Sequence, residues 1–313
     1  MTTVAADGLR EYLRERRQDV DAALRRALPA PGQCPALICD AMAYSVFAGG
    51  KRFRPVLTLA AADAVSGGDP RARERAMPAA CAIEMIHTYS LIHDDLPAMD
   101  DDTLRRGKPT LHVVHGEGMA ILAGDGLHAE AFALLAREPD HAGDPELAAR
   151  KLAVIQCVSD AAGPMGMVGG QAIDLRAAGH GADTTILTAD GLRDMHARKT
   201  GALIRASAVA GAVMAGASPG QTAAIDDYAA GLGLAFQIVD DVLDVEGAAA
   251  ELGKSTGKDA AANKPTYPLF FGLDESRRLA RSATDTALAA LDRAGFGRTR
   301  LADIAEWLVS RTS

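Results

Sequence analysis

Aromatic residues and long hydrophobic runs are both scarce in this 313-residue chain. Only 4% of its residues are aromatic although 48% are hydrophobic, so mainly alanine and aliphatic side chains are available for a core. No uninterrupted apolar run approaches the roughly 20 residues that span a membrane as a helix. The charged N-terminal stretch MTTVAADGLREYLRERRQ lacks the apolar segment of a signal peptide. We therefore expect a cytoplasmic protein without an integral membrane segment.

Cysteine and positive charge are also in short supply. The four cysteines (Cys34, Cys39, Cys81 and Cys157) form no CxxC pair and have no His partners at zinc-finger spacing, so we expect reduced thiols. The formal net charge of −8 argues against nucleic acid as the main partner, because phosphate backbones attract strongly basic surfaces. A small phosphate ligand needs only a local basic cluster and is not excluded.

What the chain does contain is helical periodicity. A stripe formed by Leu9, Tyr12, Leu13, Val20, Ala23 and Leu24 recurs at helical spacing in the first segment, and alternating apolar and polar residues typical of strands are absent. Gly and Pro gather in short clusters, none long enough for a flexible linker between domains. The sequence predicts an all-α fold and a single domain over residues 1–313.

Two of the predicted helices carry most of the information. One begins at Arg71 or Pro78 and ends near Leu96, because Pro97 cannot continue a regular helix. The other begins with a capping box, with Ser218 as N-cap, Pro219 at the first helical position and Gln221 at the third. Its apolar stripe continues to about Gly247.

The second of these helices carries an acidic stripe without a local counter-charge. Gln237, Asp240, Asp241 and Asp244 are spaced i, i+3, i+4 and i+7, and residues 206–253 contain no Lys or Arg. A solvated acidic face is one explanation. Like charges on adjacent turns repel one another, however, so a bound metal ion is the better explanation for three aspartates without a cation.

The first helix ends in a similar cluster. Asp94 and Asp95 precede Pro97 and Asp100 follows it, so an interruption at Pro97 is needed to bring Asp100 back beside Asp94. Carboxylate oxygens suit Mg²⁺, which keeps open positions for water and phosphate. The lack of a Cys or His ligand set argues against zinc. Two such clusters facing each other predict several Mg²⁺ ions bridged by a polyphosphate.

Basic residues follow or precede these clusters at several points. In GGKRFRP (49–55) a basic turn leads into a helix with Pro55 at its first position, and helix N-termini favour anions. A basic surface turn is the alternative for this segment. Arg105, Arg106 and Lys108 follow the first aspartates, and arginine forks suit phosphate oxygens. LGKS (252–255) is not a Walker motif, because the earlier glycine, Gly247, is one position too far away and an aspartate-rich helix precedes it rather than a strand.

These segments together resemble a known family. GGKRFRP, HTYSLIHDDLPAMDDDTLRRGKPTLH (87–112), GGQAIDL, KTGAL (199–203), FQIVDDVLD (236–244), LGKSTGKD and NKPTYP are similar, in this order, to the short-chain trans-prenyl diphosphate synthases, most of all to the bacterial farnesyl type. The resemblance implies a homodimeric bundle of mostly antiparallel helices around a central active-site cavity. It also implies condensation of isopentenyl diphosphate with an allylic diphosphate, dependent on Mg²⁺ with Mn²⁺ as a substitute.

The resemblance assigns roles to individual residues. Asp94, Asp100 and Asp240 would contact the metal most directly, with Asp95, Asp241 and Asp244 supporting them or binding through water. The allylic diphosphate would be held by Arg105, Lys199, Thr200, Gln237, Lys254 and Lys264. The isopentenyl diphosphate would be held by Lys51, Arg54, His87 and Arg106.

Product length is expected to depend on Tyr89. It precedes Asp94 by five residues, roughly 7 Å along a helix, where a ring could form the floor of the chain cavity. Ser90 beside it is small. A packed core tyrosine is the alternative, and geranyl or geranylgeranyl diphosphate are the alternative products. A class I terpene synthase, an HD-type phosphohydrolase and a non-catalytic synthase-like subunit fit the two intact aspartate motifs less well.

Overall fold

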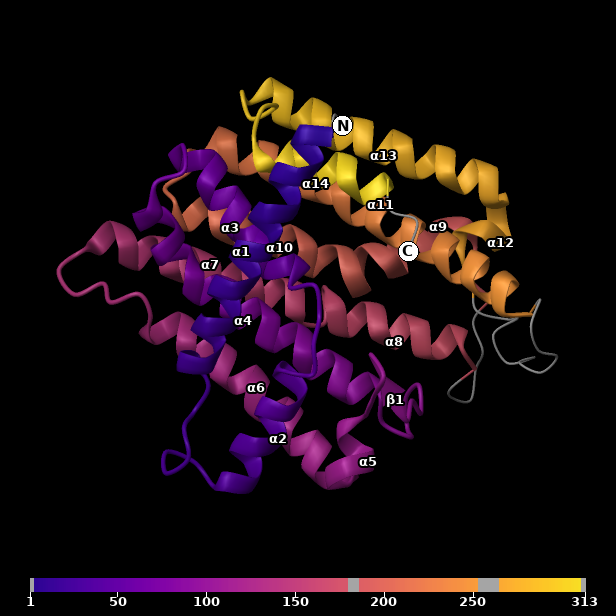
Figure 1. The fold of residues 1–313 in the computed structure, drawn as a ribbon, viewed down its shortest axis with the longest axis horizontal. Coiled ribbons are helices and arrows are strands. Elements are labelled where there is room, and N and C mark those ends of the chain that lie inside the picture. The colour runs from indigo at the N-terminus through magenta and orange to yellow at the C-terminus, as the bar shows by residue number, and fades with distance from the viewer. Residues whose placement is uncertain (1–2, 180–185, 253–264, 311–313) are drawn as a thin grey trace. The chain divides into compact units, whose positions relative to one another are not determined.

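The computed structural model describes residues 3–179, 186–252 and 265–310, and nearly all of its elements are helices (Figure 1). The predicted all-α class is confirmed. By its contacts the chain divides into two compact units. Residues 10–158 and 207–217 form the N-terminal unit, and residues 1–9, 159–206 and 218–313 form the C-terminal unit. The prediction of one domain over the whole chain stays a prediction.

The N-terminal unit is built around one long helix, α4 (Pro70–Asp94), which packs against α3 (Phe53–Ser66) and α6 (Glu117–Arg137). Asp69 caps α4 by accepting a hydrogen bond from the Arg71 N–H at 3.0 Å, and Pro70 occupies the first turn, where a missing N–H costs nothing. Its other helices are α1 (Thr3–Ala27, begun in the C-terminal unit), α2 (Ala36–Val46), α3 (Phe53–Ser66), α5 (Leu111–His115), α6 (Glu117–Arg137) and most of α7 (Pro145–Ala162).

Glycines allow close approach of helices in this unit. A Cβ on Gly124 of α6 would lie 2.1 Å from the His93 ring of α4, and one on Gly211 would lie 1.9 Å from the Thr58 carbonyl oxygen. Helix α4 ends at Asp94, as Pro97 predicts. A two-stranded antiparallel hairpin follows, with β1 (Leu104–Arg105) and β2 (Lys108–Pro109). Arg106 and Gly107 form its turn with φ of 53° and 74°, the left-handed conformation that two-residue hairpin turns require.

The longest helix of the C-terminal unit is α11 (Pro219–Leu252), which packs along α13 (Leu273–Arg293). The predicted capping box is confirmed: Gln221 N–H donates to Ser218 Oγ at 3.3 Å, and Ser218 N–H donates to Gln221 Oε1 at 2.9 Å. The predicted end near Gly247 is wrong, because three alanines with high helix propensity follow it. The unit also contains α8 (Met167–Ala177), α9 (Ala189–His196), a π-helix η1 (Ala197–Gly201), the start of α10 (Ala202–Met214), α12 (Tyr267–Phe271) and α14 (Arg300–Val309).

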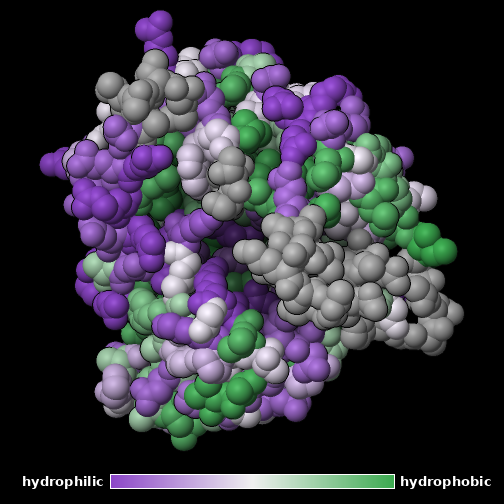
Figure 2. Space-filling model, turned by 45° about the vertical axis from the view of Figure 1, so that its right-hand side comes forward, coloured by the Kyte–Doolittle hydropathy of each residue, from purple (hydrophilic) through white to green (hydrophobic). Residues whose placement is uncertain are grey.

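Alanine and aliphatic side chains form most of the buried surface, as the composition requires. Hydrophilic side chains predominate on the face drawn in Figure 2, where apolar side chains form separate patches. Two helical segments, Glu117–Arg137 and Pro145–Ala177, are long and apolar enough to cross a membrane by length and composition. Core helices of soluble proteins meet the same criterion, so the expectation of no membrane segment stays a prediction.

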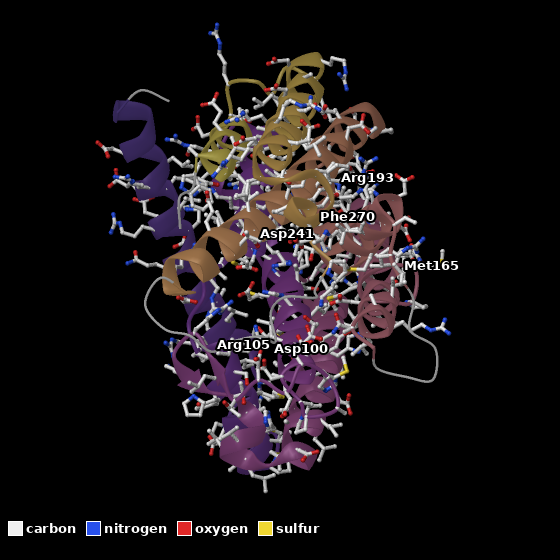
Figure 3. The ribbon with its side chains drawn as sticks, turned by 90° about the vertical axis from the view of Figure 1, so that its right-hand side faces the viewer. Asp100, Arg105, Met165, Arg193, Asp241 and Phe270 are labelled. Atoms are coloured by element: carbon white, nitrogen blue, oxygen red, sulfur yellow. A yellow bond between two sulfur atoms is a disulfide. The ribbon has the colours of Figure 1, made fainter. Side chains whose placement is uncertain are left out.

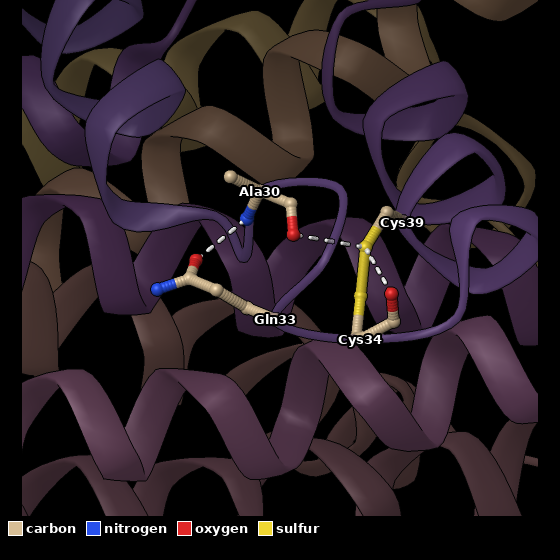
Figure 4. Close-up of a disulfide and its surroundings, with 4 residues drawn as sticks. All are labelled: Ala30, Gln33, Cys34 and Cys39. Carbon is tan, nitrogen blue, oxygen red and sulfur yellow. Dashed lines mark hydrogen bonds between the residues drawn. A yellow bond between two sulfur atoms is a disulfide. The ribbon is translucent and has the colours of Figure 1, made fainter.

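The expectation of four reduced thiols is wrong for two of them. Cys34 and Cys39 form a disulfide whose Cα atoms are 6.5 Å apart, within the range that such a bond spans (Figure 4). The turn before α2 brings them together, because the side-chain oxygen of Gln33 accepts the Ala30 N–H at 2.8 Å and folds residues 30–33 back. Neither Cys81 nor Cys157 forms a disulfide in the part of the chain that the structure describes.

Candidate active site

A cavity beside the C-terminal half of α4 collects charged groups of the N-terminal unit. We call it the α4 cavity, and its charged or titratable lining residues are Glu84, His87, Asp95, Arg105 and Arg106. Thr110 and Tyr44 also line it, and the Tyr44 hydroxyl donates to the Pro109 carbonyl at 2.7 Å, which fixes the hairpin against α2. The cavity therefore contains predicted ligands of both diphosphates, Arg105 for one and His87 with Arg106 for the other.

The predicted basic turn lies at the same place. Arg106 Nη1 donates to the Gly49 carbonyl oxygen. A Cβ on Gly50, whose φ is 133°, would lie 2.3 Å from that nitrogen, so this contact requires glycine. Lys51 is exposed and Arg54 is half-buried. Helix α3 begins at Phe53 rather than Pro55. Proline is tolerated there because the first helical N–H groups have no partner within the helix.

Burial and positive charge act together on the titratable groups of this cavity. The pKa of His87 lies well below its usual value, because burial disfavours the charged ring and because Arg54, Arg106, Arg105 and Arg52 surround it. Burial also lowers the pKa of Arg106. A neutral imidazole among guanidinium groups can accept or donate a hydrogen bond, and it would gain a proton more readily once an anion is bound.

The turn after α4 brings Asp100 back beside Asp94, as the sequence predicts. Asp100 N–H donates to the Asp94 carbonyl oxygen at 2.9 Å, so the first and last aspartates of the motif lie together. Asp95 is only 4% exposed, and its Oδ1 accepts from Arg105 Nε at 2.6 Å. Burial raises the pKa of Asp95 against the lowering effect of Arg105. Figure 3 shows Asp100 and Arg105 on the segment that follows α4.

The second aspartate motif lies on α11, in the C-terminal unit (Figure 3). Asp241 is 6% exposed and is held by protein groups on both oxygens, since Gln237 Nε2 donates to Oδ1 and Tyr267 N–H donates to Oδ2, each at 2.9 Å. Asp240 is partly exposed and Asp244 is exposed. Asp241 thus joins α11 to the start of α12. Asp240 and Asp244 are both more exposed to solvent than Asp241.

Lys199 and Thr200 lie on the π-helix η1. Lys199 Nζ is 2.5 Å from Asp174 Oδ2 of α8, and Asp174 is only 5% exposed. A Cβ on Gly170 would lie 2.2 Å from the Lys199 backbone nitrogen, so α8 and η1 touch through their backbones. Sequence reasoning missed Asp174, although GGQAIDL contains it. The available signal was the spacing, which places Asp174 one helical turn after Gly170 in this segment.

Not every predicted residue can be placed. Lys254 and Lys264 lie outside the described residues. Within residues 3–179, 186–252 and 265–310, no three His, Cys, Asp or Glu side chains are gathered closely enough to hold a metal ion. The metal-ligand predictions therefore stay predictions. The six aspartates offer hard carboxylate oxygens, and this donor chemistry fits Mg²⁺.

Tyr89 is part of a row of aromatic rings between α4 and α6, which meet in edge-to-face and tilted contacts. It is 8% exposed, and its ring centroid lies 5.6 Å from that of His93 and 4.8 Å from that of His128. Phe132 follows, 5.4 Å from His128. Ser90 Oγ donates to the His87 carbonyl at 2.9 Å, so this hydroxyl is used within the helix. Contacts on α6 therefore hold the Tyr89 ring in place.

Comparison with known proteins agrees with the motifs and the helical fold. The family described as polyprenyl synthetase matches residues 35–293. The chain belongs to this family. It is 46% identical to the farnesyl diphosphate synthase of Geobacillus stearothermophilus, over 96% of this chain and 97% of that one. It is 43% identical to the geranylgeranyl diphosphate synthase of Cyanophora paradoxa, over 96% of each.

Solved structures agree as well. The crystal structure of an FPP/GFPP synthase from Zymomonas mobilis matches with a TM-score of 0.82 and 36% identity, covering 97% of this chain and 99% of that one. A geranyltransferase from Legionella pneumophila matches with a TM-score of 0.80 and 32% identity, covering 98% of each. The predicted family resemblance is confirmed.

Proposed function

We propose that this polyprenyl synthetase condenses isopentenyl diphosphate head-to-tail with an allylic diphosphate, dimethylallyl or geranyl, and releases farnesyl diphosphate and diphosphate. The observation that carries the proposal is the α4 cavity, where His87, Arg105 and Arg106 lie beside the first aspartate motif. Relatives named farnesyl diphosphate synthase and dimethylallyltranstransferase, 46% and 43% identical, support it. The two substrates are the small-molecule partners, and no nucleic acid is involved.

The metal proposed is Mg²⁺, with several ions and with Mn²⁺ as a substitute. Asp94, Asp100 and Asp240 would hold it, supported by Asp95, Asp241 and Asp244. The exposure of Asp100 and Asp244 suits residues that bind a metal with its water shell. Bound Mg²⁺ would neutralise negative charge on the diphosphate oxygens.

Different basic side chains would bind the two substrates. Arg105 and Lys199, with Thr200 and Gln237, would hold the allylic diphosphate and stabilise charge as its C–O bond breaks. Lys51, Arg54, His87 and Arg106 would hold isopentenyl diphosphate, whose double bond attacks the allylic cation. The departing diphosphate would accept the proton lost at the end. The Asp95 and Asp174 carboxylates fix Arg105 and Lys199 in place before substrate arrives.

Product length is assigned to the Tyr89 ring. Its burial and its contact with His128 support a rigid floor, which favours a fifteen-carbon product. A geranylgeranyl product is the second candidate, since a geranylgeranyl diphosphate synthase is also among the relatives at 43% identity. Geranyl diphosphate is the remaining alternative.

The enzyme is proposed to be a cytoplasmic homodimer. Exposed aliphatic side chains on α2, α5 and α6, helices that pack against one another, support an apolar contact with a second copy: Leu37, Val113, Val114, Ile121 and Leu122. Light scattering after size-exclusion chromatography tests the dimer, and replacing Leu122 by Asp should shift the mass to that of one chain.

A product assay tests the function. Purified protein is incubated with Mg²⁺, labelled isopentenyl diphosphate and, separately, dimethylallyl, geranyl and farnesyl diphosphate, and the alcohols are identified after dephosphorylation. Farnesol as the final product supports the proposal. Longer alcohols would still indicate a prenyl diphosphate synthase, but they would overturn the proposal that Tyr89 limits the product to fifteen carbons. Cyclic hydrocarbons would indicate a terpene synthase, and no condensation would indicate a non-catalytic subunit.

A further inference from the structure

Arg52 is the most deeply buried basic residue of the GGKRFRP segment. It is 5% exposed and lies directly before α3 in the left-handed conformation, with φ of 51°. Any residue other than glycine adopts this conformation at a cost, because its Cβ crowds the backbone, so the surrounding contacts must hold Arg52 there.

Those contacts come from three different helices. Arg52 Nε donates to Asp21 Oδ1 of α1 at 2.8 Å, and Nη1 donates to Glu84 Oε1 of α4 at 2.9 Å. Nη2 donates to the carbonyl of Val46, the last residue of α2, at 2.6 Å. All three guanidinium nitrogens therefore donate to protein acceptors, and these bonds fix the plane and position of the Arg52 side chain.

The segment held by Arg52 is the one predicted to bind isopentenyl diphosphate. Lys51 precedes it, and Arg54 follows two residues later. On the other side of the turn, Arg106 donates to Gly49 and packs on Gly50. The backbone of residues 49–54 is thus fixed between Arg106 and the Arg52 contacts, with Lys51 left exposed between them.

Arg52 also neutralises a charge in the α4 cavity. Glu84 lines that cavity three residues before His87, and it is 3% exposed. A buried carboxylate without a partner would repel a diphosphate and would itself be unstable. The Arg52 guanidinium is the cation that forms a salt bridge with it, at 2.9 Å.

We propose that Arg52 is a positioning residue for isopentenyl diphosphate: it holds the 49–54 turn in its binding conformation and neutralises Glu84, without touching the substrate. The inference rests on the proposed function, because it takes the 49–54 turn as the isopentenyl diphosphate site. Lysine cannot replace it, since one ammonium group cannot reach three acceptors arranged around a planar fork.

Two kinds of measurement test this role. The dissociation constant for isopentenyl diphosphate is measured by calorimetry with Mg²⁺, and KM and kcat are measured with geranyl diphosphate as the second substrate. Arg52→Lys should weaken isopentenyl diphosphate binding about tenfold or more, the equivalent of one lost charge-assisted hydrogen bond. KM for geranyl diphosphate should stay within about twofold and kcat at saturation within about threefold.

Three further variants separate the two effects and remain informative if Arg52→Lys folds poorly. Glu84→Gln keeps an acceptor for Nη1 but removes the carboxylate charge, so isopentenyl diphosphate should bind as well as in the wild type or better. Arg52→Met should weaken binding, and the double variant Arg52→Met/Glu84→Gln should recover part of the loss. Arg73→Lys is the matched control, because Arg73 pairs with Asp63 at 2.8 Å away from the cavity lining.

The outcomes distinguish this inference from the proposed function. Unchanged isopentenyl diphosphate binding in Arg52→Lys and Arg52→Met, with condensation intact, overturns the positioning role and leaves the function standing. Equal losses for both substrates, or the same loss in Arg73→Lys, show a general effect on folding and also overturn it. Selective loss of isopentenyl diphosphate binding supports it, even in a protein that fails to condense. A wild-type protein that binds no isopentenyl diphosphate overturns both.

Discussion

Asp95 and Arg105, ten residues apart, form the tightest salt bridge of the α4 cavity: Arg105 Nη2 and Nε lie 2.5 Å and 2.6 Å from the same carboxylate oxygen. Burial lowers the pKa of Arg105, but the hydrogen bond and charge of Asp95 outweigh this, so the pKa lies above its usual value. The second aspartate of the motif therefore serves first to hold an arginine.

This relationship separates Asp95 from its neighbours in the motif. Asp95→Asn should raise KM for the allylic diphosphate about tenfold, because Arg105 loses a charged partner worth roughly 1.5–3 kcal/mol. Asp94→Asn should instead lower kcat at saturating substrate. Steady-state kinetics with each substrate varied in turn measures both. A loss of kcat in Asp95→Asn equal to that in Asp94→Asn would contradict the distinction.

Removal of the metal should abolish condensation. We expect EDTA to stop product formation and added Mg²⁺ to restore it, and we expect Asp100→Asn to raise the Mg²⁺ concentration needed for half-maximal rate at least about tenfold, since one carboxylate ligand is lost. Asp101→Asn is the matched control. Asp101 is the next residue, exposed and in the left-handed conformation that asparagine tolerates. Equal effects in the two variants would contradict the assignment of Asp100 as a metal ligand.

The row of aromatic rings around Tyr89 gives a graded prediction for product length. Tyr89→Ala removes the buried ring, so the chain cavity deepens and twenty-carbon or longer products should appear. Tyr89→Phe should keep farnesyl diphosphate, because the ring remains. His128→Ala should give a mixture, since it removes the ring 4.8 Å from Tyr89. Chromatography of the dephosphorylated alcohols measures the distribution, and unchanged products in Tyr89→Ala would make Tyr89 a packed core residue only.

His87 should make the fold sensitive to acid. Its pKa in the folded chain lies well below the unfolded value of about 6.5, so the unfolded state binds more protons between these two values. Stability should therefore fall as the pH drops below about 6.5, by at most about 1.4 kcal/mol per pH unit from this group. Urea unfolding from pH 7.5 to 5 should show a smaller fall in His87→Gln than in the wild type. If the free energy of unfolding falls equally with pH in the variant and the wild type, His87 does not cause the fall.

The contact between α8 and the π-helix predicts an effect on the allylic substrate. Gly170→Ala places a methyl group within 2.2 Å of the Lys199 backbone nitrogen, so η1 must shift and carry Lys199 away from Asp174. KM for geranyl diphosphate should rise several-fold. Gly220→Ala is the control, because nothing lies within 4 Å of that Cβ. If both variants behave like the wild type, the placement of Lys199 does not depend on this contact.

The parts of the fold set by local chemistry could be predicted from the sequence. The capping box at Ser218, the helix end before Pro97 and the return of Asp100 to Asp94 each follow from one or two residues, and each is confirmed. The apolar stripe of the first helix is likewise buried at Leu9, Val20 and Leu24.

Features that depend on contacts distant in the sequence could not be predicted. The Cys34–Cys39 bond required the turn geometry before α2, and the pairing of Lys199 with Asp174 required α8 to touch η1. The three anchors of Arg52 come from residues 31 and 32 positions away and from the end of α2. No periodicity in a single segment indicates such partners.

The π-helix between α9 and α10 carries a consequence for insertions and deletions. Residues 189–214 run as one continuous helical stretch whose middle turn, Ala197–Gly201, is widened by about one residue. Side chains before and after this turn are therefore out of step with a single 3.6-residue repeat. A one-residue deletion within 197–201 would restore that repeat and would turn one half of the stretch by about 100° relative to the other. A change in the length of the segment bearing Lys199 should therefore disturb the helices on both sides of it, whichever residue is removed.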